Sequence, residues 1–345
     1  MAHNINTYIG RQSAWHNLGT VTGSYTTWNE ILDDGGLDFQ VEKQPLFDQF
    51  GNKLDGAYGV FRYDTGMTKA GTFLGQVGEG YQTIDHSKGF EMIDSLMDTS
   101  DGAHYETAGV LGKGEVVWGL ADLGLTARVG DDIQQGYLLF ATGHTGNMQH
   151  QYRICMERVV CQNTLNIALT QGAKNVFRVK HTKNATLKLN NAHEALGMLE
   201  SDVRTMEQKL NFLTTRRVTK ESMVSILDRL FPKKKVENGE DESSTRRENI
   251  LAEIMLTYED NDGNTFPEQR GTAYNLLNAI TNYTDHQRST KGDMRSESAL
   301  FGSGDKLKGQ AYEIIMEGAG AMPENRQYVA ASRGYSLEGT GLLGM

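Results

Sequence analysis

The residues best suited to chemistry gather in one stretch near the middle of the chain. Residues 158–193 carry six basic side chains and no acidic one, although the whole chain has a formal net charge of -10. We name this stretch the basic window. Its cations are Arg158, Lys174, Arg178, Lys180, Lys183 and Lys188. Basic side chains interleaved with an aromatic one suit contacts to phosphates with a base stacked between them.

A solvated strand face is the alternative interpretation of the basic window, in which the lysines only keep the surface soluble. In a strand, Arg178 and Lys180 would share one face, and Phe177 would lie on the other. If the window binds nucleic acid, we expect Arg153 and five of the window's cations to contact phosphates. Those five are Arg158, Lys174, Arg178, Lys180 and Lys183, and the rings expected to stack on bases are Phe177 and His181.

Histidines and cysteines offer a second kind of chemistry. His144, His150, Cys161 and His181 could serve as acid, base or nucleophile if they converged on a pocket. The alternative is that the histidines at 144 and 150 occupy a hairpin loop and that Cys161 is a small buried hydrophobe. Adding Cys155 gives ligand types that suit zinc, but the spacing matches no compact zinc ribbon or finger. We therefore expect no metal and no cofactor.

A third candidate is a polar set around the loop that precedes a helix predicted over residues 161–169. The N-terminus of such a helix could bind an anion through its unpaired backbone amides. The set comprises His144, Asn147, His150, Arg153, Arg158, Gln162 and Asn163. The sequence contains no phosphate-binding Gly-rich motif ending in Gly-Lys-Ser/Thr, no His-Glu-x-x-His and no Gly-x-Ser-x-Gly. No established catalytic motif therefore identifies a reaction.

Strands and one helix must position these residues in the first half of the chain. Short runs of β-branched and aromatic residues punctuated by glycine are typical of strands. They predict strands at 39–44, 58–63, 105–111, 115–120, 137–142 and 151–156, and apolar residues at helical spacing predict a helix within 83–97. The expected fold class is α+β, with an antiparallel β-sheet core and flanking helices over residues 1–190.

The second half is predicted to be helical, over residues 191–317. From Ala192 to Leu213 the apolar residues alternate at steps of four and three for three heptads. This stripe could pack against a helix predicted at 219–230, or it could pair with another subunit. Further helices are expected at 247–258, 270–285 and 305–317, with an exposed linker at 232–246 and a loose tail at 318–345.

Bulk properties place the protein in a reducing compartment. There is no basic stretch followed by an apolar run at the start of the sequence and no apolar run long enough to span a bilayer. Two cysteines are too few for a disulfide framework, so both are expected to be thiols. We expect a cytoplasmic protein of a bacterial host cell that does not bind a membrane.

Several segments resemble a family of phage- and plasmid-related proteins, described as domain of unknown function 932. They are Trp15-His-Asn-Leu-Gly-Thr20, Val41-Glu-Lys-Gln-Pro-Leu-Phe47, Tyr105-Glu-Thr-Ala-Gly109, Val159-Val-Cys-Gln-Asn-Thr-Leu165, Lys180-His-Thr-Lys-Asn184, Gly271-Thr-Ala-Tyr-Asn275, Tyr283-Thr-Asp-His286 and Ser298-Ala-Leu-Phe-Gly-Ser-Gly304. Tyr274 departs from the family, which tends to have tryptophan there. The resemblance implies a protein carried by mobile elements and assigns no reaction.

A more distant resemblance concerns topology. The predicted order of helix, antiparallel strands and helix over 83–169 is similar to the core of single-strand annealing proteins, which form rings and hold DNA in a basic groove. Fold analogy alone cannot carry function. The leading hypothesis is a single-stranded nucleic-acid binding protein of a phage or plasmid, acting in mobile-element replication or recombination as a homo-oligomer that could anneal strands.

Two alternatives belong to other functional classes. One is an enzyme that acts on a phosphorylated or nucleotide-like small molecule through the histidines and cysteine named above. The other is an interaction protein that inhibits a host factor through an acidic surface mimicking the charge of nucleic acid.

Overall fold

The structure, a computed structural model, confirms the α+β class, with two antiparallel sheets and a helical C-terminal region. It describes residues 5–10, 20–21, 25, 27–32, 35–66, 71–98, 103–158, 164–166, 176–179, 199–235, 241–242, 244–259, 266–289, 298–299 and 302–320. Every statement below concerns these residues. Within them, no helix combines the length and apolar character that crossing a membrane would require.

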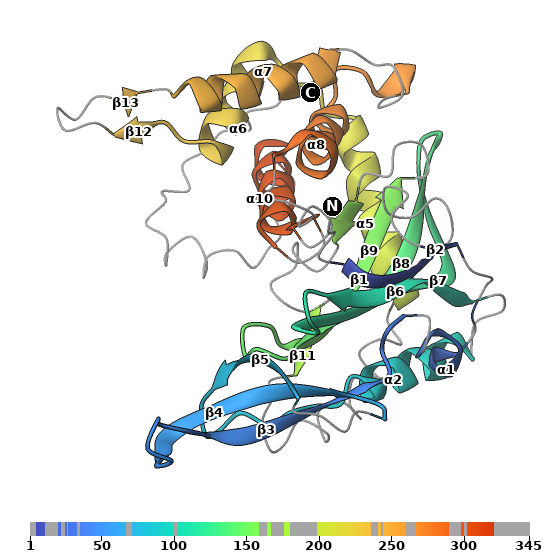
Figure 1. Cartoon of the computed structure of the whole chain (residues 1–345). Coiled ribbons are helices and arrows are strands. Elements are labelled where there is room, and N and C mark those ends of the chain that lie inside the picture. Colours follow the sequence, from blue (N-terminus) through green and yellow to red (C-terminus); the bar gives the residue numbers. More distant parts are fainter. Residues whose placement is uncertain are drawn as a thin grey trace.

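A large sheet forms the centre of the molecule (Figure 1). Its strand order is β10-β9-β8-β7-β6-β1-β2, with β11 also paired to β9. All pairs are antiparallel except β1 with β2. The strands are β1 (Ile5–Gly10), β2 (Thr20–Val21), β6 (His104–Leu111), β7 (Val116–Val129), β8 (Asp132–Gly143), β9 (His150–Arg158), β10 (Thr164–Asn166) and β11 (Val176–Val179).

A second sheet of three strands contains the predicted hairpin near residues 39–63. Its strands are β3 (Phe39–Phe47), β4 (Lys53–Asp64) and β5 (Thr72–Val77), in the order β3-β4-β5. Helices α1 (Trp28–Leu32) and α2 (Ser87–Met97) lie near this sheet, below the large sheet in the view of Figure 1. The predicted helix within 83–97 is thus confirmed.

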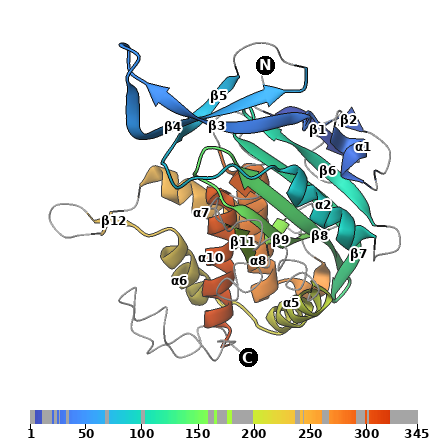
Figure 2. The same cartoon turned by 90° about the horizontal axis from the view of Figure 1, so that it is seen from below.

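Helix α2 packs closely on one face of the large sheet, as the view from below shows (Figure 2). Phe90 and Ile93 are fully buried on this helix. Two glycines permit the close approach: a Cβ at Gly89 would lie 2.2 Å from the Phe140 ring, and one at Gly119 would lie 2.5 Å from Phe90. No side chain larger than hydrogen fits at either position without a shift.

The second half contains the predicted helices. They are α5 (Leu199–Thr214), α6 (Lys220–Leu230), α7 (Thr245–Glu259), a 3-10 turn η2 (Pro267–Gln269), α8 (Ala273–Asn282), a π-helical turn η3 (Tyr283–Gln287) and α10 (Ser303–Gly318). Thr219 caps α6 through a capping box with Ser222. Two short strands, β12 (Lys234–Lys235) and β13 (Asp241–Glu242), form a hairpin inside the predicted linker.

The described part of the heptad stripe is covered within the chain. Val203, Met206, Leu210 and Leu213 of α5 are at most 2% exposed. They join one hydrophobic core with residues of α6, α8, α10 and the large sheet. Helix α5 lies mainly against β7 and α8 rather than against α6. The intramolecular interpretation is therefore confirmed, although the stripe's main neighbours differ from the helix that we expected.

The same core crosses the boundary that we predicted near residue 190. Ala127, Val129, Ile154 and Met156 of the sheet pack with the buried residues of the C-terminal helices. Tyr274, the departure from the family pattern, is fully buried there and donates a 2.6 Å hydrogen bond to Asp132. The division into a core domain and a helical region stays a prediction, because one core connects the two.

One predicted helix is wrong where the structure describes it. Residues 164–166, inside the helix expected at 161–169, form strand β10 and pair antiparallel with Glu157, Met156 and Cys155 of β9. A short apolar run is ambiguous between helix and strand, and pairing with an open sheet edge decides it. The anion site predicted at the N-terminus of that helix therefore loses its basis. The resemblance to single-strand annealing proteins also loses one element, because it required a helix after the strands.

Candidate functional site

Polar side chains cluster on one face of the large sheet. Directly paired residues on neighbouring strands point to the same side, so the register defines rows across the sheet. One such row is His104, Asp122, Tyr137 and Cys155, on β6, β7, β8 and β9. Arg153 and Glu157, two residues either side of Cys155, point the same way. We name the face defined by this row, together with Glu106, the polar face.

Irregular pairing shapes the polar face where β6 meets β7. The register shifts between Tyr105 and Thr107 on β6 and between Asp122 and Leu125 on β7. Gly124 takes a φ of 71°, which favours glycine, and its N–H donates a 2.7 Å hydrogen bond to Asp122. Such bulges turn side chains away from their regular directions and are frequent beside active sites.

Three ligand-type side chains meet at these bulges. One ligand atom from each of His104, Glu106 and Asp122 lies within 4.8 Å of the other two. His104 Nε2 lies 3.3 Å from a carboxylate oxygen of Glu106. Gln135 on β8 donates a 2.8 Å hydrogen bond to Asp122. An imidazole and two carboxylates are a donor set that can hold a divalent metal ion.

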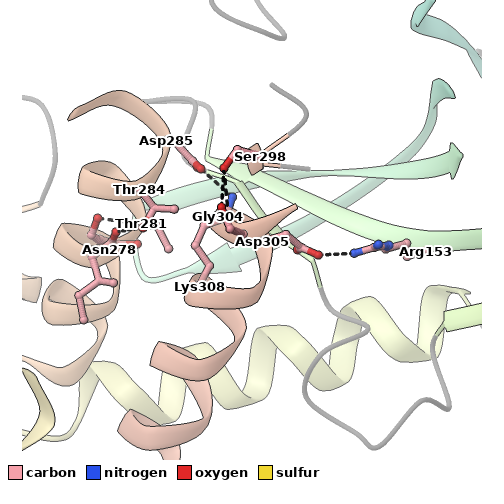
Figure 3. Close-up of polar contacts among 11 residues, drawn as sticks. Arg153, Asn278, Thr281, Thr284, Asp285, Ser298, Gly304, Asp305 and Lys308 are labelled. Carbon is pink, nitrogen blue, oxygen red and sulfur yellow. Dashed lines mark hydrogen bonds and ion pairs between the residues drawn. The ribbon is translucent and has the colours of Figure 1, made fainter. Parts of the chain in front are cut away.

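Helix α10 and the η3 turn cover the other end of the polar face with paired charges (Figure 3). Arg153 forms a 2.6 Å ion pair with Asp305 of α10. Lys308, one turn further along α10, forms a 2.7 Å ion pair with Asp285 of η3. All four side chains are at most 4% exposed. At this degree of burial the solvent contributes little to stabilising the charges, so each ionised side chain depends on its ion pair for stabilisation.

Two groups on β9 are held in their neutral forms. Burial, followed by repulsion from Glu106 and Asp285, raises the pKa of Glu157 to about 8. Among the described residues no donor reaches Glu157 Oε2, and the residue is 6% exposed. Burial also raises the pKa of the Cys155 thiol well above its ordinary value. Cys155 is therefore a neutral thiol rather than a nucleophile at neutral pH.

Among the side chains that the structure describes on the polar face, carboxylates outnumber lysines and arginines. Arg153 and Lys308 each form an ion pair with a carboxylate. Two further carboxylates, of Glu106 and Asp122, lie near His104.

Arg153 occupies a different environment from the one predicted. We expected it to contact phosphate, whereas its guanidinium is 4% exposed and neutralised by Asp305. A phosphate contact from Arg153 stays a prediction that requires this ion pair to open. Arg158, Phe177 and Arg178 lie in β9 and β11, whose backbone alone is described at these positions. Lys174, Lys180, His181, Lys183, Lys188 and Cys161 lie outside the described residues.

His144 and His150 are both fully buried. The ring of His144 lies 5.7 Å from that of His86 and 6.2 Å from that of Phe39. His150 hydrogen-bonds the Tyr152 hydroxyl at 3.0 Å, and both lie on the face opposite Cys155 because they differ from it by an odd number of residues. The zinc-type set of these histidines with Cys155 is therefore not brought together, and a catalytic role for either histidine stays a prediction.

Sequence reasoning missed His104, Glu106, Asp122, Asp285 and Lys308. A signal was present for some of them. His104 and Glu106 alternate with Tyr105 in a strand, and Asp122 interrupts an apolar strand, which is unusual for a buried sheet. The segments that carry the family resemblance include Glu106 and Asp285. The contacts that unite these residues join distant parts of the chain and leave no local pattern.

Comparison with known proteins gives one match. A model of the family described as Domain of unknown function (DUF932) matches residues 73–302, about two thirds of the chain. The matched region contains strands β6 to β9 and Asp285, and it ends just before α10. No curated protein and no solved structure matches.

The buried pair of Lys308 and Asp285 gives a first prediction. Lys308→Met should lower the free energy of unfolding by about 3–5 kcal/mol, because it leaves a carboxylate buried without its cation. The double variant Asp285→Leu with Lys308→Met should be less destabilised than Lys308→Met alone. Urea denaturation of four proteins, the wild type, Asp285→Leu, Lys308→Met and the double variant, completes this double-mutant cycle, and strictly additive effects would contradict the buried pair.

Glu157 gives a second prediction, measured with chelator present. Its pKa is about 8 in the folded chain against 4.5 ordinarily, so the folded state binds the extra proton and wild-type stability falls as pH rises from about 4.5 to about 8. Glu157→Gln removes this titration. The free energy of unfolding of Glu157→Gln minus that of the wild type should therefore increase between about pH 4.5 and about pH 8, by on the order of 3 kcal/mol. Above about pH 8 this difference should remain constant.

Chemical denaturation at five pH values measures the difference. The exposed Glu79→Gln exchange is the matched control, since it changes the same atoms without touching the polar face. A Glu157→Gln difference that is independent of pH between 5 and 8 would show that Glu157 is ionised in the folded chain.

Proposed function

The chain belongs to the DUF932 family, and from that premise we propose that it is a single-stranded nucleic-acid binding protein of a phage or plasmid. Its role would lie in the replication or recombination of the mobile element that carries it. The basic window is the proposed binding surface. Phosphates would contact its cations, and bases would stack on Phe177 and His181.

One observation of the fold supports the proposal more than any other. Strands β10 and β11, both inside the basic window, pair with the same strand β9. Thr164 pairs with Glu157 near one end of β9, and Val179 pairs with His150 at the other end. The described parts of the window are therefore fixed along one edge region of the sheet. A window that follows a strand could present its cations to a polynucleotide backbone as a continuous track.

Charge distribution supports the same surface. The chain carries -10 overall and the window +6, which leaves -16 for the remaining residues. Long-range repulsion would keep a polyanion away from the rest of the protein and leave the window as the favoured point of approach. Acidic proteins that bind nucleic acid depend on such a local reversal of sign rather than on net charge.

The ion pair of Arg153 reduces the set of residues that we expect to contact phosphates. Because Asp305 already neutralises Arg153, the guanidinium gains little by exchanging a carboxylate for a phosphate. The principal contacts are therefore assigned to Arg158, Lys174, Arg178, Lys180 and Lys183. Strand annealing by a homo-oligomer is a further part of the proposal, with less support, because strand β10 stands where the last helix of the annealing-protein order was expected.

Binding of a labelled oligonucleotide tests the proposal. Fluorescence anisotropy with a 30-nucleotide single strand, at several salt concentrations, should show binding whose affinity falls steeply with salt. Each neutralised phosphate contributes a slope of roughly -0.7 for single strands. Replacing Lys174, Arg178, Lys180 and Lys183 together by alanine should weaken binding about tenfold or more at low salt and reduce the slope by about 3.

The matched control carries the same change of charge elsewhere. Lys53, Lys113, Lys220 and Lys306 are exposed outside the window, and their fourfold alanine variant should keep most of the affinity and the wild-type slope. Lack of binding by the wild-type chain at low salt would end the proposal. Equal losses in the two fourfold variants would reject the window as the binding surface.

A further inference from the structure

We propose that His104, Glu106 and Asp122 bind a divalent transition-metal ion on the polar face. The inference rests on contacts of the described residues and does not depend on nucleic-acid binding. It concerns the junction of β6 and β7, which the basic window does not include.

The spacing of the three side chains fits a shared ion. One donor atom from each lies within 4.8 Å of the others, and the His104 and Glu106 atoms are 3.3 Å apart. Around an ion with bonds of roughly 2.0–2.2 Å, ligand atoms stand about 3–4 Å from one another. The distance between the His104 and Glu106 atoms already falls in this range.

The backbone and its neighbours hold the ligands in place. Register shifts on both strands fall at the site, so the strands bend where the three side chains converge. Asp122 accepts hydrogen bonds from the Gly124 N–H at 2.7 Å and from Gln135 at 2.8 Å. Outer hydrogen bonds of this kind fix the orientation of ligating carboxylates in metal sites. The Asp122 carboxylate is therefore already oriented before an ion binds.

A second, independent observation is a buried carboxyl oxygen on the polar face that no described donor reaches. Glu157 is 6% exposed, and no described donor reaches its Oε2 atom. It lies on the polar face beside Gln135, its partner in the register, which itself bonds Asp122. Burying a carboxyl oxygen without a partner is costly. A metal ion on the polar face, or a water molecule bound to that ion, would give this oxygen a partner.

The donor set identifies the class of metal. One imidazole nitrogen with two carboxylates suits ions such as Mn²⁺, Fe²⁺ and Zn²⁺, whereas Ca²⁺ and Mg²⁺ favour sites made of oxygen alone. Three protein ligands leave coordination positions for water or a substrate oxygen. His104 and Glu106 are buried, and Asp122 is partly exposed, so an ion could exchange on the side of Asp122.

Calorimetric titration of the full chain tests the proposal. After treatment with EDTA and its removal, the wild-type chain should bind one equivalent of Mn²⁺ or Zn²⁺. Glu106→Gln and Asp122→Asn should each weaken that binding at least about tenfold, because each removes a charged ligand. Asp64→Asn, which removes a carboxylate from the other sheet, should bind as the wild type does.

Folding of the variants is checked by circular dichroism before titration. Asp122→Asn keeps the side chain's shape at a partly exposed position, so it serves as the second variant if Glu106→Gln does not fold. Co²⁺ adds a readout on the His104 ligand: the visible spectrum of bound Co²⁺ should change in His104→Asn. A wild-type chain that binds none of the three ions, or binding that Asp122→Asn leaves unchanged, would overturn the proposal.

Discussion

Compensation of buried charge is the constraint on which this structure depends. On one face of the large sheet, the buried Arg153 forms a 2.6 Å ion pair with Asp305 of α10. Lys308 of the same helix forms a 2.7 Å ion pair with Asp285 of the π-helical turn. An ionised group buried without its partner costs several kcal/mol, so these pairs fix how α10 and η3 sit on the sheet. The C-terminal region is thereby bound to the sheet by charge as well as by the shared apolar core.

The two faces of the sheet consequently have different roles. Helix α2 closes one face with apolar contacts tight enough that Gly89 and Gly119 admit no side chain. The other face keeps titratable groups in a row from β6 to β9. Strand β9 connects the two proposed activities, since its side chains contribute to the polar face and its edge pairs with the strands of the basic window.

Periodic patterns predicted most of the elements but not their contacts. The hairpin of β3 and β4, helix α2, strands β6 to β9 and the C-terminal helices follow from alternation, heptads and caps such as Thr219. Strand β10 was missed because its three residues, Thr164–Asn166, carry no strand pattern of their own and gain their structure from pairing with β9. The polar face could not be predicted as a unit, because Arg153 and Asp305 are 152 residues apart. Only the ionisable residues inside strands β6 and β7, His104, Glu106 and Asp122, gave a local signal.

Anomalous X-ray scattering from crystals of the full chain grown with Mn²⁺ tests the central claim most directly, since it locates a cation on the polar face. The account predicts one strong peak at bonding distance, about 2.0–2.2 Å, from His104, Glu106 and Asp122 together. Crystals that bind Mn²⁺ only at other positions, with these three side chains still hydrogen-bonded to each other and to Gln135, would contradict it.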